Sequence, residues 1–246
     1  MPSEVDTYRI PRRGSALHIA YYVNCQPETL SAAVLRSDSA ASIDWRSPKA
    51  NRRFSEYHDR EFLAAVGHED LAEELVKWWP ASGPRWDALG VVPKTGAVIL
   101  VESKANLPEI ANGPACGSGS TGSDHGKVNR KKIDQALAVT REHFGISHEA
   151  ATAWLETHCY QYANRLAHLC FFERNGVPAH LAHIYFTGDS THIATRVKDF
   201  EAQRRADAEA MGLSAVDIGS ATGAYLPARP DAYADLRDFV AAQSAA

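Results

Sequence analysis

The sequence has neither an excess of positive charge nor a long apolar run. Its 26 lysines and arginines stand against 30 aspartates and glutamates, which leaves a formal net charge of −4. Proteins that coat nucleic acid are strongly basic, so any nucleic-acid contact here is expected from a local patch. No stretch approaches the roughly 18 apolar residues of a membrane span, and residues 1–15 contain no apolar signal-peptide core. We therefore expect a cytoplasmic protein that makes no membrane contact.

Cysteine is also sparse, and several signature motifs are missing. The four cysteines form no C-x-x-C pair and are Cys25, Cys116, Cys159 and Cys170. A zinc site and a disulfide framework are therefore poorly supported, and a reducing compartment is the default. No G-x-S-x-G sequence indicates a serine hydrolase. The Gly/Ser-rich stretch 106–126 is not a Walker A loop, because Thr121 replaces its first glycine and Val128 replaces its final Ser or Thr.

The apolar residues that are present suffice for one large domain, since they make up 45% of 246 residues. We divide the chain into a lead-in (1–50), a core (51–211) and a C-terminal helical extension (212–246). Apolar runs bounded by turn residues predict strands at 16–24, 85–92, 97–105 and 179–188, and a loop at 36–51. Helical patterns lie at 27–35, 53–79 with a break near Gly67, 127–144, 148–175, 197–211 and 231–243. This order predicts an α/β (α+β) fold with a small central mixed β-sheet flanked by helices.

The stretch RWDALGVVPKTGAVILVESKAN, residues 85–106, places charged residues inside two strand-like runs. If Lys94 and Thr95 form the centre of the turn, the numbers of opposed residues sum to 189 and Asp87 faces Glu102. Side chains alternate along a strand, so Lys104 shares a face with Glu102. This register gathers two carboxylates and an ammonium, whereas a slip of one residue would scatter them.

Two adjacent carboxylates in a partly buried site repel one another and take up a proton unless a cation lies between them. Mg²⁺ prefers oxygen and is often held by one or two carboxylates together with water and substrate phosphate. Lys104 beside such a metal would hold the attacking water or stabilise charge on the phosphorane. The alternative is a solvated edge hairpin in which Glu102 and Lys104 merely pair. The near-continuous apolar run VILVESKA argues against it, because a solvated edge strand alternates.

An acidic residue on one hairpin strand followed by Glu-x-Lys on the next resembles the motif of the PD-(D/E)XK nuclease superfamily. Asp87 and the run Glu102-Ser103-Lys104 supply the motif, and Trp86 stands where the family often has proline. The resemblance covers about residues 56–190 and looks like a bacterial branch of this superfamily. It implies a restriction-endonuclease-like fold and a Mg²⁺-dependent hydrolase, with Mn²⁺ as a substitute, that cleaves phosphodiester bonds in DNA.

The same resemblance implies a role for each residue. Asp87 and Glu102 would bind the metal together with the Ser103 backbone carbonyl, and Lys104 would position the attacking water. Gln161, on a later helix, would hold these groups in position without binding the metal itself.

A glutamate on a helix before the hairpin usually joins such a site. We take Glu73 for this role, and leave Glu56, Glu61 and Glu74 open.

A basic cluster lies at the start of the predicted helix 127–144 and consists of Lys127, Arg130, Lys131 and Lys132. Cations at a helix start oppose the helix dipole, whereas contact with nucleic-acid phosphate would explain them. A solvated basic turn remains the alternative. The expected partner is DNA, and a homodimer that completes a basic groove is compatible with the acidic balance. The alternative function is a catalytically inactive nuclease fold that binds nucleic acid or a protein partner.

Overall fold

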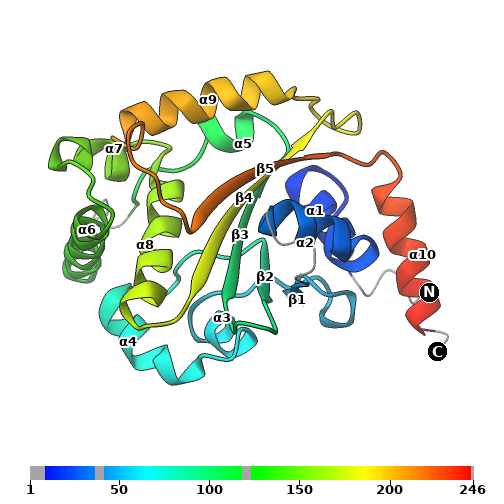
Figure 1. Ribbon diagram of the computed structural model, residues 1–246, viewed down its shortest axis with the longest axis horizontal. Coiled ribbons are helices and arrows are strands. Elements are labelled where there is room, and N and C mark those ends of the chain that lie inside the picture. Colours follow the sequence, from blue (N-terminus) through cyan, green and yellow to red (C-terminus); the bar gives the residue numbers. More distant parts are fainter. Residues whose placement is uncertain (1–8, 37–41, 118–122, 245–246) are drawn as a thin grey trace.

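The computed structural model describes residues 9–36, 42–117 and 123–244. Among these residues, five strands form one sheet in the order β1-β2-β3-β4-β5 (Figure 1). The strands are β1 Asp44–Ser47, β2 Ala88–Val91, β3 Val98–Lys104, β4 Ala179–Thr187 and β5 Ala221–Pro227. The pairs β1/β2 and β2/β3 are antiparallel, whereas β3/β4 and β4/β5 are parallel. The predicted α/β fold with a small central mixed sheet is confirmed.

Helices cover both faces of this sheet (Figure 1). One face carries α1 Gly14–Cys25, α2 Pro27–Leu35 and α10 Ala232–Ser244. The other carries α3 Asp59–Ala65, α4 Ala72–Trp78, α6 Asp124–His143, α7 Ala151–Glu156 and α8 Tyr160–Arg174. Helix α5 Pro108–Ala111 follows the end of β3, and α9 Val197–Ala210 follows β4. Short 3-10 turns lie at Ala50–Arg52, Glu69–Leu71 and His148–Ala150.

Side chains alternate along β3 and therefore pack into two hydrophobic cores, one on each face of the sheet. Val98 and Leu100 pack on the α8 face of the sheet, whereas Ile99 and Val101 pack on the α1 face. All four are fully buried, which explains why this strand is continuously apolar in sequence. Glu102 continues the row of Val98 and Leu100, so its carboxylate is directed to the α8 face.

The strand predicted at 16–24 is wrong, because these residues lie in helix α1. Residues from Leu17 to Asn24 are all buried, so apolar side chains occupy every side of the helix and the helical period is lost from the sequence. Strands β1 and β5 were not predicted. The first has four residues within 36–51, and the second is a half-exposed edge strand with a glycine at its centre.

The single helix predicted over 148–175 is broken. Ser147 caps the 3-10 turn at its start, as expected for a cap, but α7 ends at Glu156 and the backbone of the next residue, Thr157, is extended. Helix α8 then begins anew at Tyr160 and runs along the sheet. In the region 53–79, α3 begins only at Asp59, and the predicted break falls at Gly67, which has a positive φ of 85°.

The remaining predicted elements are confirmed to within a few residues: helices 27–35, 127–144, 197–211 and 231–243, and strands 85–92, 97–105 and 179–188. The sheet takes strands from all three predicted segments, since β1 belongs to the lead-in and β5 to the C-terminal extension. Part of the Gly/Ser-rich stretch, residues 118–122, lies outside the described residues. In the described ranges, no helix combines the length and apolarity that crossing a membrane requires.

Candidate active site

The hairpin has the register that the sequence predicts. Ala88 pairs with Val101 and Leu89 with Leu100, so opposed residue numbers sum to 189. Asp87, one residue before β2, therefore lies across from Glu102. The hairpin brings its charged residues together at the carboxyl end of β3, next to the amino end of β2.

Glu102 is buried, with 3% of its surface exposed, and both its carboxylate oxygens accept hydrogen bonds. Lys104 Nζ donates to Oε1 at 2.7 Å. Arg165 donates to Oε2 through Nε at 2.8 Å and through Nη2 at 2.6 Å. Burial alone would raise the pKa of Glu102, but the two cations outweigh burial and lower that pKa. Glu102 is therefore an anion at neutral pH.

Arg165, on α8, is a site residue that the sequence analysis missed. Its Cζ lies 4.9 Å from the centroid of the Trp86 ring, and its Nη2 donates to the Arg85 carbonyl at 2.8 Å. Trp86 is fully buried, and its ring supports this arginine. One signal was present in the sequence: Gln161 and Arg165 lie four residues apart and therefore share a helix face.

Lys104 lies between a carboxylate and an amide. Its Nζ donates to Glu102 Oε1 at 2.7 Å and to Gln161 Oε1 at 2.8 Å, and its side chain is 15% exposed. An ammonium has three N–H donors, so one remains for a water or a phosphate oxygen. The structure thus brings Gln161, in the first turn of α8, to Lys104 at the end of β3.

Asp87 is fixed by the strand opposite. Its Oδ2 accepts from the Ser103 backbone N–H at 2.6 Å and from the Ser103 hydroxyl at 2.9 Å. Burial first, and repulsion by Glu102 second, raise the pKa of Asp87 to about 7. The Lys104 ammonium acts against this rise, but burial and repulsion outweigh it. The role of the Ser103 carbonyl as a metal ligand stays a prediction.

A third carboxylate reaches this cluster from Glu56. An isolated antiparallel bridge joins Tyr57 to Trp86, with the Trp86 N–H donating to the Tyr57 carbonyl at 3.1 Å. The bridge places Glu56 across from Asp87. Burial first, and repulsion by Glu102 second, raise the pKa of Glu56.

Glu73, which the sequence analysis selected for this position, is not brought to the cluster. It is exposed near the start of α4 and lines a separate hollow together with Asp59 and Trp79. The bridge at Tyr57 lies outside any predicted strand, so nothing local in the sequence separated Glu56 from the other glutamates.

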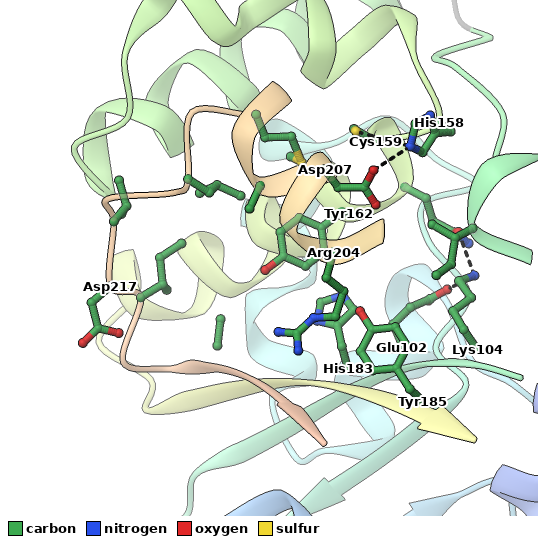
Figure 2. Close-up of a pocket in the computed structure, with 18 residues that line it drawn as sticks. Glu102, Lys104, His158, Cys159, Tyr162, His183, Tyr185, Arg204, Asp207 and Asp217 are labelled. Carbon is green, nitrogen blue, oxygen red and sulfur yellow. Dashed lines mark hydrogen bonds and ion pairs between the residues drawn. The ribbon is translucent and has the colours of Figure 1, made fainter. Parts of the chain in front are cut away.

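The parallel strands extend the site sideways across the sheet. Their registers align two rows on the α8 face: Glu102, His183 and Gly223, and then Lys104, Tyr185 and Tyr225. Burial first lowers the pKa of His183, to about 3, so its imidazole is neutral at pH 7. Figure 2 shows Glu102, His183 and Tyr185 side by side beneath a pocket.

This pocket is a cavity of about 250 Å³. Glu102, Lys104 and Gln161 are among the residues that line it. A second cavity is lined by Glu56, Asp87 and Arg165, and Gln161 lines both. The charged residues of the hairpin therefore lie between two cavities.

A mixed cluster lies at the edge of the first cavity. His158 Nε2 is 2.8 Å from Asp207 Oδ1 and 3.8 Å from Cys159 Sγ. These three potential metal ligands lie within 4.8 Å of one another. Cysteine spacing could not reveal this cluster, because His158 and Asp207 are 49 residues apart.

The predicted nucleic-acid-binding residues lie on the first turns of α6, and most are engaged locally. Lys127 pairs with Asp124 at 3.3 Å, and Arg130 pairs with Asp134 at 3.1 Å and also with Glu156. Lys132 Nζ donates to the Val76 carbonyl at 2.7 Å, while Lys131 is exposed. Their contact with nucleic acid stays a prediction.

Comparison of the chain with protein-family models, with curated proteins and with solved structures gives no match.

Proposed function

We propose that the chain is a metal-dependent nuclease that hydrolyses phosphodiester bonds, with DNA as its substrate. The observation that carries the proposal is the convergence of three carboxylates, those of Glu56, Asp87 and Glu102. Burial first, and then repulsion by Glu102 and Glu56, raise the pKa of Asp87 to about 7. Buried charge without full compensation destabilises a fold, so a cluster with a purely structural role would be more stable with one carboxylate fewer. Three carboxylates that converge in a buried place support a cation site.

The oxygen atoms of the cluster fit a hard divalent cation such as Mg²⁺, with Mn²⁺ as a substitute. Among the described residues, no group donates to Asp87 Oδ1, and Glu102 Oε1 accepts from Lys104 alone. A carboxylate offers about four lone-pair positions, so both residues retain an oxygen position for a ligand bond. A cation held by Asp87 and Glu102 supplies charge neutralisation at the phosphate and lowers the pKa of a bound water.

Lys104 has the geometry to orient that water. Glu102 and Gln161 hold its Nζ from two sides, at 2.7 and 2.8 Å, and its third N–H remains for the nucleophile or for a phosphoryl oxygen. Because the ammonium is held before substrate arrives, little reorganisation is needed during the reaction.

A nuclease fold without catalysis is the second candidate, and Arg165 favours it. Three N–H groups of Lys104 and Arg165 already donate to Glu102. If Arg165 keeps its contact with Glu102 when metal is present, Glu102 binds the cation weakly. The same surface then binds nucleic acid or a protein partner without hydrolysis.

The test is a cleavage assay on plasmid, linear and single-stranded DNA and on RNA with Mg²⁺ or Mn²⁺. The wild type is compared with Lys104→Ala, and a reaction in EDTA is run beside them. Lys77→Ala is the matched control, because Lys77 is an exposed lysine that pairs with Glu74 on α4. We expect metal-dependent cutting that Lys104→Ala abolishes and Lys77→Ala retains.

Calorimetric titration with Mn²⁺ accompanies the assay. Lys104→Ala should still bind the metal, since the lysine contributes no ligand. Undiminished cutting by Lys104→Ala excludes this lysine from the chemistry. Metal binding without cutting of any substrate supports the second candidate.

A further inference from the structure

Arg204, on α9, lies over the sheet at Gly223, a residue that has no side chain. Gly223 on β5 continues the row of Glu102 and His183. A Cβ atom at Gly223 would lie 2.6 Å from Arg204 Nη2 and 2.7 Å from its Cζ. The guanidinium therefore occupies the space that the side chain of any other residue at 223 would take.

The partners of Arg204 are tyrosines. Its Cζ lies 5.2 Å from the centroid of the Tyr185 ring, and its Nη1 donates to the Tyr225 hydroxyl at 3.1 Å. Burial alone would lower the pKa of Arg204, but these tyrosines outweigh burial and raise it. The guanidinium is thus held in place while most of its five N–H donors stay available.

Asp207, three residues further along the same helix, does not pair with Arg204. Asp207 Oδ1 accepts from Gln203 Nε2 at 2.8 Å and lies 2.8 Å from His158 Nε2. Figure 2 shows the Asp207 carboxylate turned toward His158 and away from the Arg204 guanidinium, which lies next to His183. Arg204 is only partly buried, and among the described residues no carboxylate forms an ion pair with its guanidinium. The tyrosine setting of Arg204 instead resembles a site prepared for an anion from outside the chain.

The cavity joins Arg204 to the hairpin cluster. Both Arg204 and Lys104 line it, and its remaining wall includes apolar side chains: Met211, Leu213, Val216 and Ile218. A guanidinium binds phosphate oxygens in a bidentate manner, and an apolar wall accepts the flat face of a base. A volume of about 250 Å³ is of the order needed for one nucleotide rather than for a duplex.

We propose that Arg204 binds a phosphate group of the nucleic-acid substrate, and that the cavity between Arg204 and Lys104 accommodates the attached nucleotide. This inference rests on the proposed function and adds a substrate position to it. The substrate then enters as an unpaired nucleotide, so single-stranded segments or frayed ends are preferred to intact duplex.

The test is calorimetric titration in EDTA with thymidine 5′-monophosphate, inorganic phosphate and thymidine. We expect the nucleotide to bind more tightly than inorganic phosphate, and thymidine to bind weakest. Arg204→Gln should weaken nucleotide binding about tenfold or more, because a charged hydrogen-bond donor is lost. Arg205→Gln is the matched control, since Arg205 is an exposed neighbour on the same helix.

A second variant leaves Arg204 in the sequence but displaces its guanidinium. Gly223→Ala places a methyl group against the guanidinium, so Arg204 must shift and nucleotide binding should fall. Gly219→Ala is its control, because no atom lies within 4 Å of a Cβ there. Thermal unfolding of each variant confirms that the fold is retained.

Unchanged nucleotide binding in Arg204→Gln and Gly223→Ala overturns the inference, as does a wild type that binds neither phosphate compound. The proposed function is judged separately. Metal-dependent cleavage with Arg204-independent binding retains the nuclease and rejects the phosphate site. Arg204-dependent binding without cleavage retains the phosphate site and rejects the nuclease.

Discussion

Asp87 retains a proton well above the pH at which an exposed aspartate loses it. The folded protein holds this proton up to about pH 7, whereas an unfolded chain releases it near pH 4. The folded state therefore binds the extra proton between these values, and the contribution of Asp87 to the free energy of unfolding falls as pH rises through this window. Buried His168 and His183, whose pKa values fall to about 4 and about 3, act in the opposite direction.

Because these histidines also change the stability with pH, the effect of Asp87 is measured as a difference in the free energy of unfolding between the wild type and Asp87→Asn. Without metal, Asp87→Asn should be more stable than the wild type by about 2–4 kcal/mol at pH 8, and the gain should vanish near pH 4. With Mn²⁺ the order should reverse, because only the wild type binds the cation. Urea unfolding at several pH values, with EDTA or Mn²⁺, measures both effects. Equal stability at every pH would show that the Asp87 carboxylate is not destabilised.

Gln161 acts through Lys104. Gln161→Leu removes the acceptor 2.8 Å from Lys104 Nζ and leaves the ammonium bound to Glu102 alone. We expect kcat to fall about 10–100-fold while KM and thermal stability change little, as is usual when a supporting hydrogen bond at a metal site is lost. Steady-state kinetics on the best DNA substrate measures the two constants. A change in KM with constant kcat would assign Gln161 to substrate binding instead.

Whether a residue of this site could be predicted from the sequence depends on how far away in the sequence its partners lie. Asp87, Glu102 and Lys104 could be predicted, because a four-residue turn and the alternation of side chains determine their alignment. Arg165 and Arg204 could not, since their partners lie across the sheet on strands and helices whose packing no local pattern reveals. Glu56 depends on a single bridge at Tyr57, which is too short to leave a periodic signal.

Helix α8 and strand β3 meet through the Arg165–Glu102 ion pair. Arg165→Met should lower the free energy of unfolding in EDTA by about 3 kcal/mol, because a buried carboxylate loses a partner. The same change should tighten Mn²⁺ binding, since a competing cation is gone. Arg174→Met, an exposed position at the end of α8, is the control. Calorimetry and urea unfolding measure the two effects, and weaker Mn²⁺ binding would contradict the assignment of Glu102 as a ligand.

A polar face separates a helix that was predicted correctly, α6, from one that was not, α1. Helix α6 is amphipathic and its bounds were close to those predicted, whereas α1 is buried on all sides and was taken for a strand. The seam between α7 and α8 contains neither proline nor glycine, so no local breaker revealed it.

The sheet as a whole depends on the C-terminal segment. Strand β5 pairs with β4 along seven residues, and α10 packs on α1 through buried Leu236 and Val240. Deletion of residues 212–246 should therefore abolish cooperative thermal unfolding rather than trim an appendage. Circular dichroism during heating measures this. A truncated protein that melts in one sharp transition would show that the core folds without residues 212–246.

Strand β3 receives its partners at very different times during synthesis. Strand β2 is made just before it, but β4 follows only about 75 residues later, which at ribosomal rates takes roughly 4–15 s. Throughout that interval the Val-Ile-Leu-Val edge of β3 lacks its later neighbour, and an unpaired apolar edge is a template for pairing with other chains. Nascent protein should therefore need chaperone protection until β4 emerges, and slower growth at low temperature should raise the yield of folded protein.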